Sequence, residues 1–157
     1  MKSLLKIIII SMVAFLASSA YAATPKKYFD NLSSNSNFDY SYVSPYMLSA
    51  MGGQYIDGGG ISISTSDISS IETVSTLNAG ASDDLWNIIR KVKKENGLET
   101  LSTKKQGYYR YDVLGKLSDN GKTITQMLVI TQNGGNNVNV VYIVGKIPMD
   151  QIGIQFH

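Results

Sequence analysis

Residues 108–132 have the sequence YYRYDVLGKLSDNGKTITQMLVITQ, which is typical of a β-hairpin. Two runs rich in β-branched and aromatic residues flank Asn120-Gly121. This dipeptide favours a tight type I′ turn, because both central residues of such a turn need a positive φ. The turn pairs Leu117 with Ile124, and we expect the pairing to continue outward from there residue by residue.

This register gives the hairpin two faces of different chemistry. Val113 lies opposite Leu128 and Tyr111 lies opposite Ile130, so one face is apolar. The other face mixes polar and apolar side chains, and it is our candidate partner-binding surface. Its residues are Tyr108, Arg110, Asp112, Leu114, Met127 and Val129.

The mixed face is less polar than a face in contact with water alone. Antiparallel sheets normally carry polar residues on a solvated face, so we expect something to cover this one. The sequence is consistent with three possible covers for this face. They are a partner protein, a second copy of the chain, and the N-terminal segment of the same chain through Phe29 and Leu32.

The strongest helix pattern of the chain begins at Ser82, which can act as an N-cap, and Gly97 ends it. Acidic residues occupy its first turn and basic residues its last turns, as the helix dipole favours. We predict that its apolar stripe packs on the apolar hairpin face, since each is the only sizeable apolar surface that its element offers. The stripe consists of Leu85, Ile88, Ile89 and Val92.

The other segments complete an α+β pattern. Ser44-Pro45 predicts a short helix over residues 46–51, the glycine-rich residues 52–60 predict a loop, and residues 148–154 predict a last short helix. We therefore predict a two-layer α+β fold, in which one main amphipathic helix and short helices pack on one face of a mainly antiparallel sheet ending in a C-terminal β-meander. Further strand patterns occupy residues 38–42, 61–64, 71–77, 98–104 and 138–147.

The N-terminus has the three parts of a secretory signal peptide. Lys2 and Lys6 carry positive charge, residues 7–16 are almost entirely apolar, and the Ala-Tyr-Ala at 20–22 fits a cleavage site. This apolar run is too short for a spanning helix, which needs roughly 20 residues. We therefore predict cleavage after Ala22.

The predicted cleavage sets the organisation of the chain. It gives a signal peptide over residues 1–22, a polar N-terminal lead over 23–37 and a single α+β domain over 38–157. We expect the mature protein to be exported to the periplasm or secreted, and not to span the membrane. No lipid anchor is expected, because the chain has no cysteine to carry one.

Composition excludes several function classes. The chain has no cysteine and only one histidine, so Ser-His-Asp and Cys-His catalysis and the usual zinc sites are excluded. Fourteen basic and twelve acidic residues are present. Loss of Lys2 and Lys6 with the signal peptide leaves a neutral chain, which argues against nucleic-acid binding. We predict no metal and no cofactor.

Two residue classes keep a functional interpretation open. A carboxylate pair such as Asp112 and Glu72 would serve a hydrolase if the two met in a cleft and one had a raised pKa. The ordinary alternative for Asp112 is a surface ion pair with Arg110. The many tyrosines suit a binding groove, but they also suit strands in general.

Four segments together carry a family resemblance: VSPYML at 43–48, YRYDVL at 109–114, QMLVI at 126–130 and VGKI at 144–147. With the strand and helix patterns around them, they resemble the domain-of-unknown-function 4252 family over residues 38–154. The resemblance implies an exported bacterial envelope domain without an established activity, and it supplies no functional residues. Many members look like lipoproteins, whereas this chain lacks the cysteine.

These observations favour a non-catalytic exported envelope domain that binds a partner protein, an envelope component or a second copy of itself. One alternative is a fimbrial or matrix subunit, in which residues 23–37 would act as a donor strand. The other is a carboxylate-based hydrolase of glycan or peptide.

Overall fold

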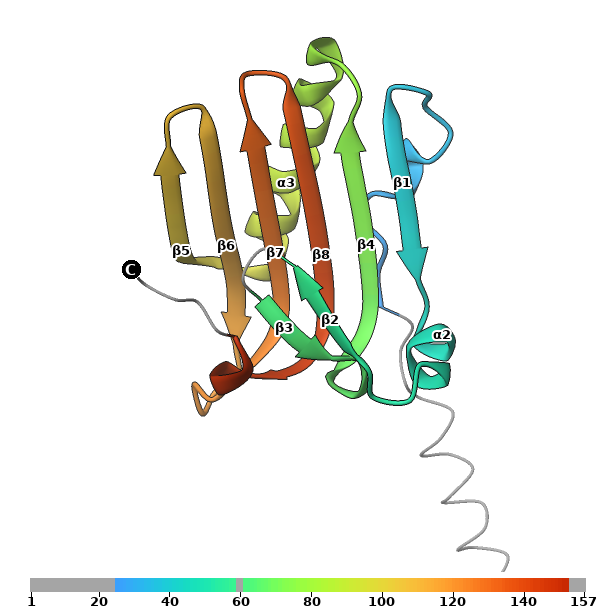
Figure 1. Cartoon of the computed structure of the whole chain (residues 1–157), viewed down its shortest axis with the longest axis vertical. Helices are drawn as coiled ribbons and strands as arrows, with labels where there is room; N and C mark the ends of the chain where they lie inside the picture. The colour runs from blue at the N-terminus through green and yellow to red at the C-terminus, as the bar shows by residue number, and fades with distance from the viewer. Residues whose placement is uncertain (1–24, 59–60, 153–157) are drawn as a thin grey trace, which may run out of the picture.

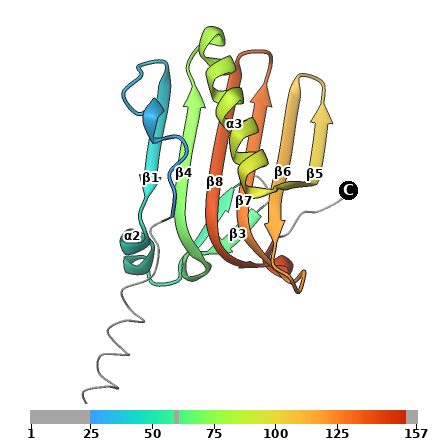
Figure 2. The same cartoon turned by 180° about the vertical axis from the view of Figure 1, so that it is seen from behind.

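Six antiparallel strands form the central sheet, in the spatial order β1-β4-β8-β7-β6-β5 (Figure 1). The computed structural model describes residues 25–58 and 61–152. Helix α3 (Ser82–Asn96) crosses one face of the sheet (Figure 2). The predicted α+β class with an antiparallel sheet and a C-terminal β-meander is confirmed. The strands are β1 (Phe38–Val43), β4 (Ile68–Thr76), β5 (Glu99–Gln106), β6 (Tyr109–Leu117), β7 (Thr123–Asn133) and β8 (Asn137–Pro148).

The predicted signal peptide at 1–22 lies outside the described residues.

Smaller elements lie around the sheet. Helix α2 (Pro45–Ala50) starts at Ser44-Pro45 as predicted, and the Ser44 hydroxyl accepts a hydrogen bond from the Met47 backbone N–H at 3.3 Å. Leu48 of α2 is buried on the face opposite α3, so the short helices do not all share one face. The 3₁₀ turns described are η1 (Asp30–Leu32), η2 (Thr65–Asp67), η3 (Ala79–Ala81) and η4 (Met149–Gln151).

The prediction of a loop over residues 52–60 is wrong for its second half. Strand β2 (Tyr55–Gly58) pairs with β3 (Ile61–Ser64) in a small antiparallel hairpin, and Ile56 lies opposite Ile63. The surrounding glycines disfavour a strand by local propensity, but tertiary burial of the isoleucines overrides that preference. The hairpin lies against the sheet face opposite α3 (Figure 1).

A β-bulge in β7 changes the predicted register of the β6–β7 hairpin. Leu117 pairs with Ile124 as predicted, but Lys116 pairs with Gln126, which leaves Thr125 without a partner on β6. A bulge adds one residue to one strand, and a one-residue shift moves every later side chain to the other face. The hairpin at Asn120-Gly121 is confirmed, but the predicted type I′ turn is wrong, because Gly121 has a positive φ of 67° and Asn120 does not. The register beyond Leu117 and Ile124 is wrong as well.

The bulge also decides which side chains face α3. Val113 pairs with Val129 and Leu114 pairs with Leu128, so the predicted pairing of Val113 with Leu128 is wrong. Leu114, Leu128 and Ile130 share a buried cluster with α3, whereas Val113 belongs to the cluster on the hairpin side. The predicted packing of the helix on Val113 and Tyr111 is accordingly wrong as well.

Helix α3 itself follows its sequence pattern closely. Gly97 ends it in the left-handed conformation at φ 62°, as the sequence predicts. Ser82 is the first helical residue rather than the N-cap, because the turn η3 runs directly into the helix. Ile88 is partly buried at the edge of the cluster. The buried part of the stripe is Leu85, Ile89 and Val92.

The N-terminal segment packs beside α3 on the same face of the sheet. Phe29 and Leu32 are buried in the α3 cluster. Glu72 of β4, only 2% exposed, accepts hydrogen bonds from the backbone N–H groups of Tyr28 at 2.8 Å and Phe29 at 3.1 Å. The Tyr40 hydroxyl donates a third at 3.1 Å. One buried carboxylate thus anchors this segment to the sheet.

Candidate functional site

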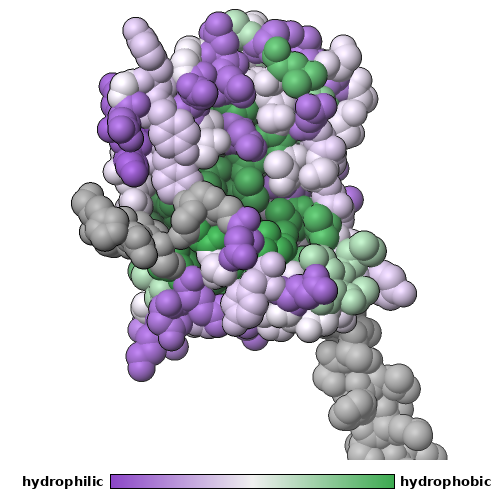
Figure 3. Space-filling model, viewed as in Figure 1, coloured by the Kyte–Doolittle hydropathy of each residue, from purple (hydrophilic) through white to green (hydrophobic). Residues whose placement is uncertain are grey.

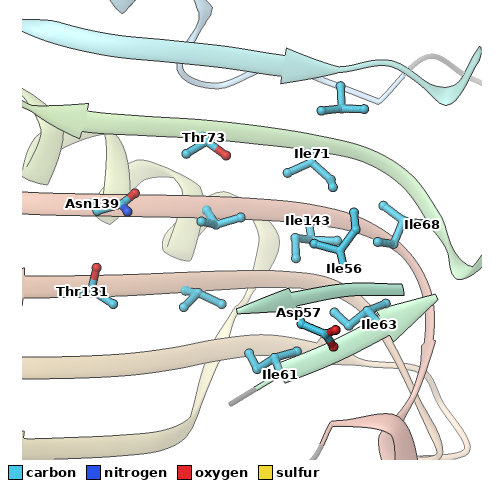
Figure 4. A pocket seen from close by; sticks show the side chains of 13 residues that line it. Ile56, Asp57, Ile61, Ile63, Ile68, Ile71, Thr73, Thr131, Asn139 and Ile143 are labelled. Atoms are coloured by element: carbon cyan, nitrogen blue, oxygen red, sulfur yellow. The ribbon is translucent and has the colours of Figure 1, made fainter. Parts of the chain in front are cut away.

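A cavity of about 440 Å³ lies between the β2–β3 hairpin and the sheet (Figure 4). Its volume falls in the range of roughly 300–1,000 Å³ that is usual for small-molecule sites. Nine of its thirteen lining residues are Ile or Val. Figure 3 shows hydrophobic surface gathered on this part of the face, with hydrophilic surface around it. The cavity is therefore the candidate site of the described chain.

The hairpin forms one wall of the cavity. Ile61 and Ile63 of β3 are buried and Ser62 between them is exposed, so the alternation of the strand turns both isoleucines toward the sheet. Ile56 of β2 lines the same wall. The hairpin is held at its base, where the Thr65 backbone N–H donates to the Gln54 carbonyl oxygen at 2.8 Å.

The sheet forms the other wall, and its side chains become more polar along the strands. Beneath the hairpin, Ile71 of β4 lies opposite Ile143 of β8. The next row on this face is mixed, with Thr73 opposite Val141. In the row beyond that, Asn139 of β8 lies opposite Thr131 of β7. Figure 4 shows Thr73, Thr131 and Asn139 together at one end and the isoleucines at the other.

The polar end of the cavity is uncharged. Thr73, Thr131 and Asn139 form no side-chain hydrogen bond with another residue that the structure describes, so their donors and acceptors are available. Asp57, the charged residue of the lining, is exposed on the hairpin at the other end (Figure 4). The cavity therefore combines an aliphatic interior with a neutral polar end.

Tyr111 extends the polar row across the sheet. It lies opposite Thr131 and is 8% exposed. Its hydroxyl is buried and has no hydrogen-bond partner among the described residues. Burial raises the pKa of the Tyr111 phenol further above its ordinary value, which already lies well above neutral pH, so the protonated hydroxyl can donate a hydrogen bond.

The structure does not bring the residues of the predicted partner-binding surface onto one face. Met127 and Val129 lie on the hairpin side, where Met127 is fully buried and Val129 lines the cavity. Leu114 lies on the other side, buried beneath α3 with Phe29 and Leu32. The bulge at residue 125 separates the two groups, because it reverses the facing of β7 relative to β6.

The remaining residues of that predicted surface lie near the β5–β6 edge. Tyr108 is 88% exposed in the turn before β6. Arg110 Nε donates to Asp112 Oδ2 at 2.6 Å, and the Thr103 hydroxyl donates to Asp112 Oδ1 at 2.7 Å. Asp112 is 6% exposed, so its partners satisfy a buried carboxylate rather than an open surface pair.

The structure holds Asp112 and Glu72 well apart. They lie on β6 and β4, with β7 and β8 between them. Three strand spacings amount to about 14 Å. Paired carboxylates in glycoside hydrolases lie about 5–9.5 Å apart. The two carboxylates serve instead in separate local hydrogen-bond networks.

Residues 25–58 and 61–152 contain no group of three or more His, Cys, Asp or Glu side chains placed to hold a metal ion. No helix within those ranges has the length and apolar character needed to cross a membrane.

Sequence reasoning found only part of the cavity. It predicted a strand over 61–64 and named Val129, but it treated Ile56 and Asp57 as loop residues. The alternation of Ile61 and Ile63 with serines was a signal of a one-sided strand. The position of that strand over Ile143 depends on contacts distant in sequence, which no local pattern encodes.

The fold and the cavity define a small α+β protein with a helix on one face of its sheet and a ligand-sized pocket beneath a hairpin on the other. The chain belongs to the family described as Domain of unknown function (DUF4252), whose model matches residues 28–154. This confirms the resemblance found in the sequence and extends it to Tyr28. No curated protein and no solved structure shows significant similarity to the chain.

Proposed function

We propose that this protein is a non-catalytic binding domain of the bacterial envelope, and that it captures an apolar ligand in the cavity between the β2–β3 hairpin and the sheet. The cavity carries the proposal, because its walls are aliphatic and its volume is that of a small-molecule site. An apolar ligand gains free energy on entry by leaving water.

Two further features support this role. The sheet face beneath α3 is filled by the helix and by Phe29 and Leu32, whereas the opposite face has the cavity. The segment over residues 1–22 has the pattern of an export signal, and a bacterial envelope is rich in apolar and amphipathic components.

The proposal is tested with N-phenyl-1-naphthylamine, an uncharged fluorophore that brightens in apolar sites. The fluorescence of the probe should rise as wild-type protein is added and then reach a plateau. Val141→Glu should weaken binding by about tenfold or more, because the new carboxylate places an unpaired charge on the cavity wall. Fluorescence titration gives the affinity, and circular dichroism verifies that the variant is folded.

A matched control and a second variant complete the test. Leu77→Glu adds the same charge at a residue that is 58% exposed and outside the cavity, and it should leave the affinity unchanged. Val129→Phe fills cavity space without adding a charge, so it serves if Val141→Glu does not fold. Equal affinity in wild type and Val129→Phe would contradict the proposal.

A further inference from the structure

The residues that line the cavity define its ligand more narrowly than apolar character alone does. Ile and Val make up its aliphatic part, and no Phe, Tyr or Trp is among the described lining residues. Sugar rings are usually held against aromatic side chains, which offer a flat face. Branched aliphatic side chains offer no flat face, and they suit a flexible hydrocarbon chain.

The polar end of the cavity determines which head group the ligand can carry. Thr131 and Asn139 are cross-strand neighbours, and Thr73 lies on the adjoining strand. Their hydroxyl and amide groups offer both donors and acceptors. A head group bearing hydroxyl, ester or amide functions finds partners for each of its polar atoms there. Such a group needs no counter-charge.

Charge argues against an anionic head group. No Lys or Arg is among the described lining residues, and the charged side chain present there is Asp57. A carboxylate or phosphate that leaves water without a cationic partner pays a large desolvation penalty. The same chain with a neutral head avoids this penalty.

We infer that the cavity holds an acyl chain with an uncharged polar head group. The chain lies beneath the hairpin among Ile63, Ile71 and Ile143, and the head group lies against Thr73, Thr131 and Asn139. This inference rests on the proposed function and names its ligand class. Along the strands the lining changes from isoleucine to threonine and asparagine. This change determines which end of the ligand lies beneath the hairpin.

The test compares two ligands that share one acyl chain. 1-Monolauroylglycerol carries an uncharged head and laurate carries a carboxylate. Each is titrated against the wild-type protein loaded with N-phenyl-1-naphthylamine, at neutral pH and below its critical micelle concentration. 1-Monolauroylglycerol should displace the fluorophore at a concentration about tenfold lower than laurate does.

A variant with a positive charge at the polar end of the cavity tests the role of head-group charge. Thr131→Lys puts an ammonium group beside the head-group position, so it should raise the affinity for laurate and reduce or reverse the preference. Gln132→Lys is the matched control, since it adds the same charge on the neighbouring residue of β7, which faces the other side of the sheet. This control should keep the wild-type preference.

The outcomes separate this inference from the proposed function. Failure of the wild-type protein to bind the fluorophore would overturn both. Binding of the fluorophore with equal displacement by the two ligands, or with displacement by neither, would overturn the ligand class and leave the apolar site standing. A preference that changes equally in Thr131→Lys and Gln132→Lys would also overturn it, because the effect would then come from net charge.

Discussion

Glu72 illustrates how a single residue can hold two parts of this chain together. It is buried on β4 and accepts hydrogen bonds from Tyr28, Phe29 and Tyr40, so its charge is satisfied by donors alone. Hydrogen bonds to a charged acceptor are the stronger kind. From the sequence, Glu72 was a possible half of a hydrolytic pair, because sequence shows the acid but not the donors that surround it.

Glu72→Gln should lower the free energy of unfolding by about 2 kcal/mol, because the amide loses the charge and offers one acceptor oxygen in place of two. Chemical denaturation measures the difference. The N-terminal segment should also become more sensitive to trypsin at Lys26 and Lys27. Glu99→Gln, at an exposed residue of β5, is the control. Equal stability of the two variants would contradict the anchoring role of Glu72.

At the level of the elements, local patterns predicted the strands of the large sheet and α3 but missed β2, and the exact strand pairing depended on features that sequence shows poorly. Asn120-Gly121 gave the hairpin and Leu117 opposite Ile124. The bulge at Thr125 has no distinct sequence signature, and it turned the predicted mixed face into two different faces. Met127 and Val129, two of the six residues of the candidate surface, lie on the face opposite Leu114 for that reason.

Gly145 reveals a second constraint between elements. A Cβ atom on Gly145 would collide with the backbone carbonyl oxygen of Asp67, where β4 begins beside β8. Gly145→Ala should therefore lower the free energy of unfolding by about 1–3 kcal/mol, the usual penalty of overpacking. Gly135→Ala, whose Cβ would meet no atom within 4 Å, should be close to neutral. Thermal melts that fall equally for both variants would refute the close approach.

At the scale of the whole molecule, the two faces of one sheet have different roles. The α3 face is sealed by the helix and the N-terminal segment, and the hairpin face retains a cavity. The sequence predicted the two-layer fold because strong periodic segments determine it. It did not predict the cavity, because a cavity is space left between elements whose contacts are remote in sequence.

The whole-chain organisation also predicts where the mature protein begins. Residues 1–22 have the charge, apolar run and small-residue site of a signal peptide, so the exported protein should start at Ala23. Expression in a bacterial host, fractionation and N-terminal sequencing measure this directly. A mature protein in the cytoplasm that retains Met1 would contradict it.

The most direct test of the binding site is methyl NMR of the protein titrated with N-phenyl-1-naphthylamine. The aromatic rings of this probe shift the resonances of nearby methyl groups. These shifts should concentrate on Ile56, Ile63 and Ile143, which line the cavity. Methyl groups of Leu85 and Ile89 in the α3 cluster should stay unchanged. Shifts centred on the α3 cluster, or no shifts at saturating probe, would contradict it.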